Sequence, residues 1–148
     1  MVELPKKILV GVDGSAAALE AARYAVKLAS KIGSAVTFLG VVDIQSLESI
    51  EKLGLVKRAA AEAAMEREMK NFTEEAAKIA EEIGVQCDQL VATGDIVQTI
   101  IDTAIRGGYG LLVIATRKKV SLERIAAGEH TARLVDFSPI PILIYKQV

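Results

Sequence analysis

Five short apolar runs alternate with longer segments of helical periodicity along the chain. The runs fall at residues 7–12, 35–42, 85–92, 111–115 and 141–145. The run at 111–115 is apolar at every position, as in a parallel strand that is covered on both faces. Strands that alternate with helices in this way form a parallel sheet with helices on both sides. The pattern therefore predicts an α/β protein with one five-stranded parallel sheet.

Residues that start and stop helices mark the segments between the runs. Ser15 follows the first run as a good N-cap, and Gly33 supplies the stop of the same helix. The strongest helical signal covers 56–83, where apolar residues recur at spacings of four and three: Met65, Met69, Phe72, Ala76, Ile79 and Ile83. A coiled coil has the same spacing, but a long helix packed on a sheet is the simpler interpretation. Residues 44–55 are compatible with a loop or with a short helix.

The second half of the chain carries similar signals. The run at 85–92 places Cys87 in a core strand. Asp95 is the expected cap of the next helix, with Gln98 three residues later as in a capping box. A further helix is expected to start near Gly128 and to close before Ser138.

Length and composition limit the class of protein. With 148 residues, 51% hydrophobic and 25% charged, and a net charge of −1, we expect one globular domain over residues 1–148. Cys87 is the only cysteine, which excludes an intramolecular disulfide. No run approaches the roughly 20 apolar residues that span a bilayer, and the N-terminus does not resemble a signal peptide. We therefore expect a cytoplasmic protein with neither nucleic acid nor membrane as a partner.

Polar residues at the ends of two runs indicate where a ligand would bind. The run at 111–115 ends in Thr116 and the cationic segment 117–119, and the first run ends at Asp13. Ligands of open α/β sheets bind outside the carboxyl ends of the strands. Asp13 is either a turn residue that bonds its own backbone or a ligand-binding carboxylate. Segment 117–119 is either a solvated loop or an anion-binding loop.

The sequence gives no support for a catalytic mechanism. His130 is the only histidine, and we expect it in the first turn of a helix with an exposed or satisfied side chain. No Ser/His/Asp or Cys/His constellation can be assembled around it, and no cluster of metal-ligand residues is present. We therefore expect no catalytic residues, no metal and no enzyme activity.

Two segments at strand ends read Lys-Lys-Ile-Leu-Val-Gly-Val-Asp-Gly-Ser at 6–15 and Gly-Asp-Ile at 94–96. The first resembles the opening of the universal stress protein (UspA) family, and the second resembles the family's third strand-to-helix turn. Residues 111–117 resemble the fourth strand, and Ser-Pro-Ile-Pro-Ile-Leu-Ile at 138–144 is similar to the family's end. The resemblance covers nearly the whole chain. It implies the Usp fold of the adenine-nucleotide alpha-hydrolase-like type, with strand order 3-2-1-4-5, and a role in stress tolerance and signalling.

The resemblance also implies a nucleotide motif, which this chain retains in part. ATP-binding members carry Gly, two residues, Gly, nine residues, then Gly and Ser or Thr. In register, these positions are Ala115, Lys118, Gly128 and Glu129, so that one of four survives. Asp13 and Val41 match the positions at the ribose and the adenine. Side chains at 115 and 118 hinder close backbone approach to phosphate, and the Glu129 carboxylate would repel it.

Two functions follow from this resemblance. The first is a dimeric regulatory or interaction module of the stress response, with an unidentified protein partner and a degenerate nucleotide motif. The alternative is a protein that binds ATP, AMP or another anion through the loop Arg117–Lys119. Under either hypothesis ATP or AMP is a possible cofactor, and none is certain.

The end of the chain predicts how the protein assembles. The last strand should lie at a sheet edge, where its unusually apolar side chains would invite pairing with another chain: Ile140, Ile142, Leu143 and Ile144. Pro139 and Pro141 come early enough to leave the later backbone N–H groups available. Members of the resembled family commonly dimerise there, so we expect a homodimer.

Overall fold

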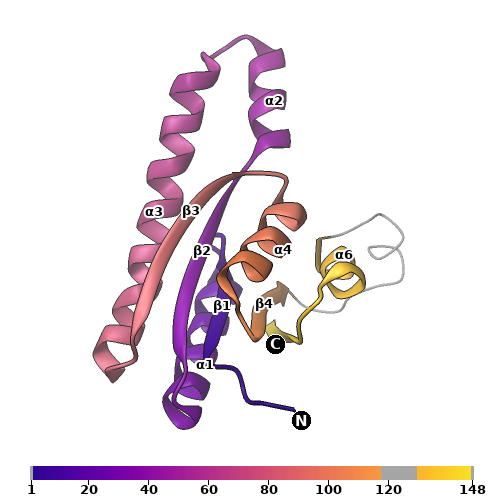
Figure 1. Ribbon diagram of the computed structural model, residues 1–148. Helices are drawn as coiled ribbons and strands as arrows, with labels where there is room; N and C mark the ends of the chain where they lie inside the picture. The colour runs from indigo at the N-terminus through magenta and orange to yellow at the C-terminus, as the bar shows by residue number, and fades with distance from the viewer. Residues whose placement is uncertain (1, 118–129, 148) are drawn as a thin grey trace.

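The computed structural model describes residues 2–117 and 130–147, and a five-stranded parallel sheet forms its centre (Figure 1). The strand order is β3-β2-β1-β4-β5, as expected from the resemblance. The strands are β1 (Lys7–Val12), β2 (Ala35–Asp43), β3 (Cys87–Gly94), β4 (Leu111–Arg117) and β5 (Ile142–Gln147). Strands β2 and β3 lie on one side of β1, and β4 and β5 lie on its other side. The switch point of the sheet is therefore between β1 and β4.

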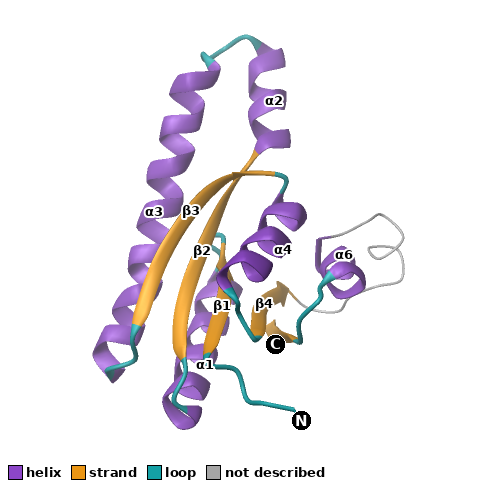
Figure 2. Cartoon of the chain, viewed as in Figure 1, coloured by secondary structure: helices purple, strands orange, loops and turns teal. Residues whose placement is uncertain are grey.

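Helices cover both faces of the sheet (Figure 2). The helices are α1 (Ala16–Ile32), α2 (Ile44–Leu53), α3 (Arg58–Ile83), α4 (Ile96–Gly107) and α6 (His130–Phe137). Helices α1 and α3 pack on one face, over a core that includes Ile8, Val10 and Phe38. Helices α4 and α6 pack on the other face, over Leu9, Leu39 and Leu112. Because alternate residues of β1 enter the two cores, the strand is buried on both sides.

The helix signals of the sequence are confirmed at the first crossover. The Ser15 hydroxyl oxygen accepts a hydrogen bond from the Ala18 backbone N–H at 3.1 Å, which caps α1. Gly33 ends the helix in the left-handed conformation at φ 74°. The α1 face that packs on the sheet consists largely of alanines, so this helix lies close to the strands.

Residues 44–55, which the sequence left open, form α2 and the turn after it. Asp43 Oδ1 accepts from the Gln45 N–H at 3.0 Å, and Gly54 ends the helix at φ 67°. Helix α2 packs against the first half of α3, and together they make a helical hairpin that rises beyond the end of the sheet (Figure 1). The second half of α3 packs on β2 and β3 instead, which accounts for the helical spacing without a coiled coil.

Three sequence interpretations are wrong in detail. Strand β3 is not a core strand but a sheet edge, where Leu90 is 42% exposed and Cys87 is half-buried. Thr116 and Arg117 are not loop residues but the end of β4, because the backbone of β5 pairs with them whatever their polarity. Gln98 does not complete a capping box, since its side-chain amide donates to Asp102 Oδ1 at 2.8 Å. The expected helix start near Gly128 lies outside the described residues.

Candidate functional site

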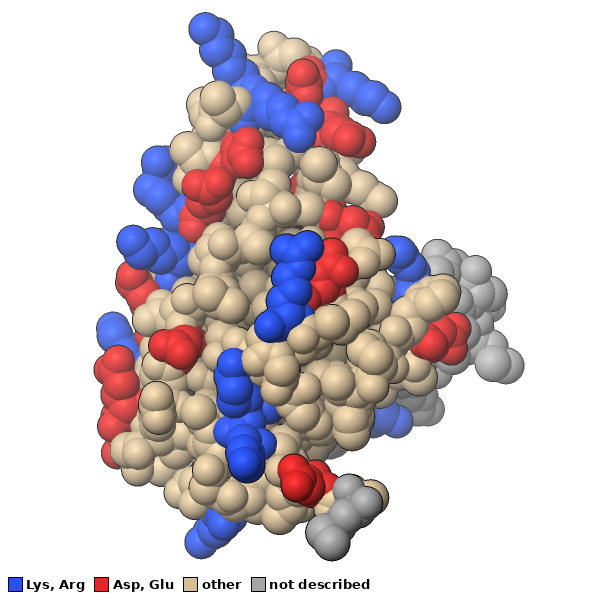
Figure 3. All heavy atoms as spheres, viewed as in Figure 1, with Lys and Arg blue, Asp and Glu red and all other residues tan. Residues whose placement is uncertain are grey.

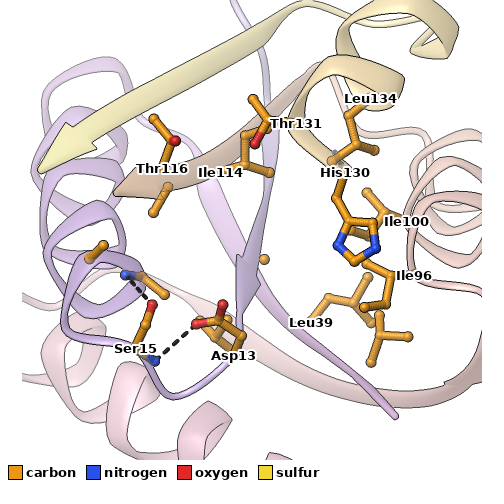
Figure 4. A pocket seen from close by; sticks show the side chains of 16 residues that line it. Asp13, Ser15, Leu39, Ile96, Ile100, Ile114, Thr116, His130, Thr131 and Leu134 are labelled. Carbon is orange, nitrogen blue, oxygen red and sulfur yellow. Dashed lines mark hydrogen bonds between the residues drawn. The ribbon is translucent and has the colours of Figure 1, made fainter. Parts of the chain in front are cut away.

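A cavity of about 300 Å³ opens at the switch point, outside the carboxyl ends of β1 and β4 (Figure 4). Four parts of the fold contribute to it: the β1–α1 turn, the end of β2, the start of α4, and the wall formed by β4 and α6. Its lining residues are Gly11, Val12, Asp13, Ser15, Ala17, Ala18, Leu39, Val41, Ile96, Ile100, Ile114, Ala115, Thr116, His130, Thr131 and Leu134. The cavity is where parallel α/β sheets bind ligands.

The β1–α1 turn forms the first wall of the cavity and holds its carboxylate. Asp13 Oδ1 accepts a hydrogen bond from the Ser15 backbone N–H at 2.9 Å, so Asp13 does stabilise its own turn. Its side chain also borders the cavity beside Ser15 (Figure 4). The turn role and a ligand-binding role are therefore compatible, because a carboxylate has further lone pairs to offer a donor in the cavity.

Gly14 is required by the shape of this turn. It has φ +86°, a conformation that side chains disfavour, and a Cβ atom there would overlap the aromatic ring of Phe72. Phe72 comes from α3 and packs partly buried against the core under α1. The helix on this face thus presses against the turn, which fixes the position of Asp13 relative to the sheet.

The floor of the cavity is apolar. It is made by side chains from β2, α4, β4 and α6: Leu39, Val41, Ile96, Ile100, Ile114 and Leu134. These residues belong to the core between the sheet and helices α4 and α6. A flat apolar group, such as a nucleobase, fits a floor of this kind, with polar groups at the rim to orient it.

The wall opposite the β1–α1 turn is formed by the end of β4 and the start of α6. Ala115 and Thr116 come from β4, and His130 and Thr131 come from the first turn of α6. In Figure 4 the Thr131 side chain and the His130 imidazole both lie at the cavity. Helix α6 is held by the buried Leu134 and by a partly exposed ion pair between Arg133 Nη2 and Asp95 Oδ2 at 3.8 Å.

A sequence model of the universal stress protein family matches residues 5–146. The chain belongs to the universal stress protein family. The universal stress protein MJ0531 of Methanocaldococcus jannaschii is 30% identical over 144 residues, which are 97% of this chain and 84% of that relative.

Solved structures share the fold of this universal stress protein. The structure of hypothetical protein MJ0577 has a TM-score of 0.78 at 23% identity, covering 97% of this chain and 96% of the other. A universal stress protein in complex with cAMP gives 0.70 at 17% identity, with coverage of 96% and 97%. A family member from Arabidopsis thaliana with AMP bound gives 0.67 at 18% identity, with coverage of 97% and 93%. At these identities the likeness establishes the fold.

The predicted site residues of this universal stress protein fall into three groups. Asp13, Val41 and Ala115 all border the cavity, although they come from three different strands or turns. Lys118, Gly128 and Glu129 lie outside the described residues, so Ala115 alone of the four phosphate-motif positions has a described geometry. The predicted interface residues lie in β5 or just before it, at a sheet edge: Ile140, Ile142, Leu143 and Ile144.

Sequence reasoning missed the contribution of α4 and α6. Ile96, Ile100 and Thr131 look like ordinary helix residues, and only packing brings them to the same cavity. His130 was expected to be exposed or satisfied; it is exposed and also borders the cavity. The strand order could have placed His130 at the cavity, because the helix after the fourth strand begins beside the switch point.

Other chemistry is limited in the part of the chain that the structure describes. Within residues 2–117 and 130–147, no three metal-ligating side chains come together. Burial raises the pKa of the Cys87 thiol, and the carboxylates of Glu81 and Asp88 raise it further. A thiol with a raised pKa is a poor nucleophile at neutral pH. None of the described helices is long and apolar enough to cross a membrane.

Proposed function

We propose that this protein is a dimeric regulatory module of the cytoplasmic stress response that works by binding and not by catalysis. Its cavity would take the nucleoside part of an adenine nucleotide and hold the phosphates weakly. The observation that carries this proposal is the uneven construction of the cavity. A carboxylate and an apolar floor are in place, while the motif that cradles phosphate is altered at three of four positions.

The nucleoside half of the proposal rests on the floor and on Asp13. A base would lie on the apolar floor, near Val41, where it loses contact with water. The Asp13 carboxylate would accept hydrogen bonds from ribose hydroxyl groups, and hydrogen bonds to charged groups are among the stronger ones. Two structural relatives hold ligands of the corresponding class, AMP in one and cAMP in the other.

The phosphate half rests on the motif. Ala115 at the cavity carries a Cβ where ATP-binding members have glycine, and Lys118 and Glu129 replace a second glycine and a hydroxyl residue. A side chain hinders the close approach of backbone N–H groups to phosphate oxygens. A glutamate in the motif repels the same oxygens. Relative to the intact motif, these changes should therefore weaken the binding of AMP, which has one phosphate, less than the binding of ATP, which has three.

The melting temperature measured with adenosine, AMP and ATP, each with and without magnesium, tests this proposal. A ligand that binds only the folded state raises the melting temperature by mass action. We expect a clear rise with AMP, a rise no larger with ATP, and little dependence on magnesium. No shift with any of the three would mean that the cavity does not serve nucleotides, and turnover of ATP would contradict the binding-only role.

A second candidate is an ATP or anion site that uses the cationic loop in place of the glycines. Arg117 ends β4, directly after Thr116 at the cavity, and Lys118 and Lys119 follow it in the sequence. Under this hypothesis ATP would bind more tightly than AMP, because the loop attracts each added negative charge. Arg117→Gln would then weaken ATP more than AMP, and raised salt would reduce the difference.

The homodimer is proposed from the β5 edge. Ile142, Leu143 and Ile144 are half-buried in the single chain, and Val135 and Phe137 on the adjoining α6 are exposed. An exposed apolar edge is a site for pairing with another chain. We expect a dimer in sedimentation at micromolar concentration. Phe137→Ser with Val135→Ser should weaken it, whereas Ile105→Ser, another exposed apolar position, should not. A monomeric wild type would contradict the proposal.

A further inference from the structure

The turn between α2 and α3 forms the outer end of the helical hairpin, and we call residues 52–58 the hairpin tip. The hairpin rises beyond the end of the sheet, so the tip projects away from the strands and from the cavity (Figure 1). We propose that the hairpin tip docks on the surface of a lipid bilayer that contains anionic lipids. This role is separate from the nucleotide cavity.

Large apolar side chains are exposed at the hairpin tip. Leu53, Leu55 and Val56 have 70%, 82% and 49% of their surface exposed. The interior of the hairpin is already filled by other residues: Val42, Leu47, Ile50, Ala61, Met65 and Met69. The three apolar side chains of the tip are therefore not needed to pack the hairpin. Moving each of them from water into apolar surroundings would lower the free energy.

The backbone of the tip is ordered by local interactions, so these side chains are presented without a rearrangement. Gly54 takes the left-handed conformation at φ 67°, and its N–H donates to the Glu51 carbonyl oxygen at 3.1 Å. Arg58 Nη1 lies 3.3 Å from Glu51 Oε2 and joins the two helices. A preformed apolar tip loses less conformational entropy on insertion than a disordered loop would.

The charge of the tip fits an anionic surface. Residues 51–58 contain three cationic side chains and one carboxylate, Lys52, Lys57, Arg58 and Glu51, so their formal net charge is +2. Glu51 is paired with Arg58, whereas neither lysine is in an ion pair with a described residue. Figure 3 shows several Lys and Arg side chains at the outer end of the hairpin, with acidic side chains among them. Cations beside an apolar tip favour a surface that is anionic outside and apolar beneath.

The size and shape of the tip favour a bilayer over a protein partner. Three side chains bury far less than the roughly 800 Å² per partner of a stable protein interface. A projecting tip also needs a matching hollow in a protein, whereas a fluid bilayer adapts to it. From the sequence we expected no membrane partner because no segment could span a bilayer, but docking at the surface requires no spanning segment.

Sedimentation with vesicles tests the proposal. The full chain should sediment with phosphatidylglycerol vesicles and much less with phosphatidylcholine vesicles. The triple variant Leu53→Ser, Leu55→Ser and Val56→Ser should bind at least tenfold more weakly. Lys52→Gln with Lys57→Gln should weaken binding roughly 25-fold, at about fivefold for each lysine. Matched controls elsewhere on the surface, Ile105→Ser and Lys27→Gln with Lys31→Gln, should leave binding unchanged.

Fluorescence gives an independent readout, because the chain contains no tryptophan. Leu55→Trp should shift its emission to shorter wavelength with phosphatidylglycerol vesicles, while Ile105→Trp should not. Equal sedimentation of wild type with both lipids, or unchanged binding by the tip variants, would overturn the proposal. So would a tip variant that alters only the association state of the chain, since the tip would then be an interface between copies.

Discussion

The two walls of the cavity differ in how firmly the fold determines them. The β1–α1 wall is fixed from several directions: Ser15 caps α1, Asp13 bonds the turn, and Phe72 from α3 covers Gly14. On the opposite wall, the end of β4 is held between β1 and β5, but α6 is attached through fewer interactions among the described residues, chiefly Leu134 and a partly exposed ion pair.

Under the proposed function, this difference would explain how one half of a nucleotide motif can change while the fold stays the same. Residues of the β1–α1 wall are also needed for folding, because the turn and the first helix depend on them. Lys118 and Glu129, which the resemblance assigns to the motif, come between β4 and α6 in the sequence, whereas the described strands and helices carry the apolar core. Substitutions outside an apolar core generally change stability little.

The largest expected effect comes from a substitution in the β1–α1 wall. Gly14→Ala should lower the free energy of unfolding by roughly 2–4 kcal/mol, because a Cβ at positive φ would also overlap the Phe72 ring. Gly33→Ala is the matched control, since Gly33 also has positive φ but no atom within 4 Å of the added Cβ. It should lose only about 1 kcal/mol. Urea unfolding of both variants measures the difference, and equal losses would show that Phe72 exerts no constraint.

The second prediction introduces the motif residues of ATP-binding members at positions 115, 118 and 129. Ala115→Gly, Lys118→Gly and Glu129→Ser together should tighten ATP binding by roughly 10- to 100-fold, since charge-assisted hydrogen bonds to phosphate become available. Calorimetry with ATP on both proteins measures this gain. The single variant Glu129→Ser removes only the repulsion between the carboxylate and phosphate. Its difference from the triple variant therefore gives the contribution of the two glycines. Low-micromolar ATP binding by the wild type would show instead that the cationic loop already serves the phosphates.

A smaller effect is expected from the carboxylate of the rigid wall. Asp13→Asn keeps an oxygen for the Ser15 N–H but removes the charge, so AMP should bind roughly five- to tenfold more weakly with little change in stability. Asp43→Asn is the matched control, because Asp43 makes the same type of turn bond to Gln45 away from the cavity. If the two variants bind AMP alike, Asp13 is only a turn residue.

The smallest effect concerns the attachment of α6. Arg133→Gln removes the ion pair to Asp95 and should lower stability by about 0.5 kcal/mol, as for other exposed pairs. Asp95→Ala removes both the pair and the cap of α4, where Asp95 Oδ2 accepts from the Gln98 N–H at 2.9 Å, and should lose about 1–2 kcal/mol. Thermal unfolding of the two variants compares them. An Arg133→Gln loss as large as that of Asp95→Ala would show that α6 is held more firmly than its contacts indicate.

Local signals in the sequence determined most of the fold. The apolar runs located all five strands to within about two residues, and Ser15 and Gly33 marked the ends of α1, because these signals act through neighbouring backbone groups. The family resemblance pointed to Asp13, Val41 and Ala115, and all three border the cavity. The strand order came from the family resemblance, and the structure has the same order.

Tertiary structure decided which residues from different elements meet. An apolar run does not reveal whether its strand lies at the centre or at an edge, so the run at 85–92 by itself did not show that β3 is an exposed edge strand. Ile96, Ile100 and Thr131 reach the cavity because α4 and α6 pack on the same face of the sheet. The exposure of Leu53 and Leu55 likewise depends on whether other side chains fill the hairpin first. Burial and proximity belong to the packed chain, and no local pattern encodes them.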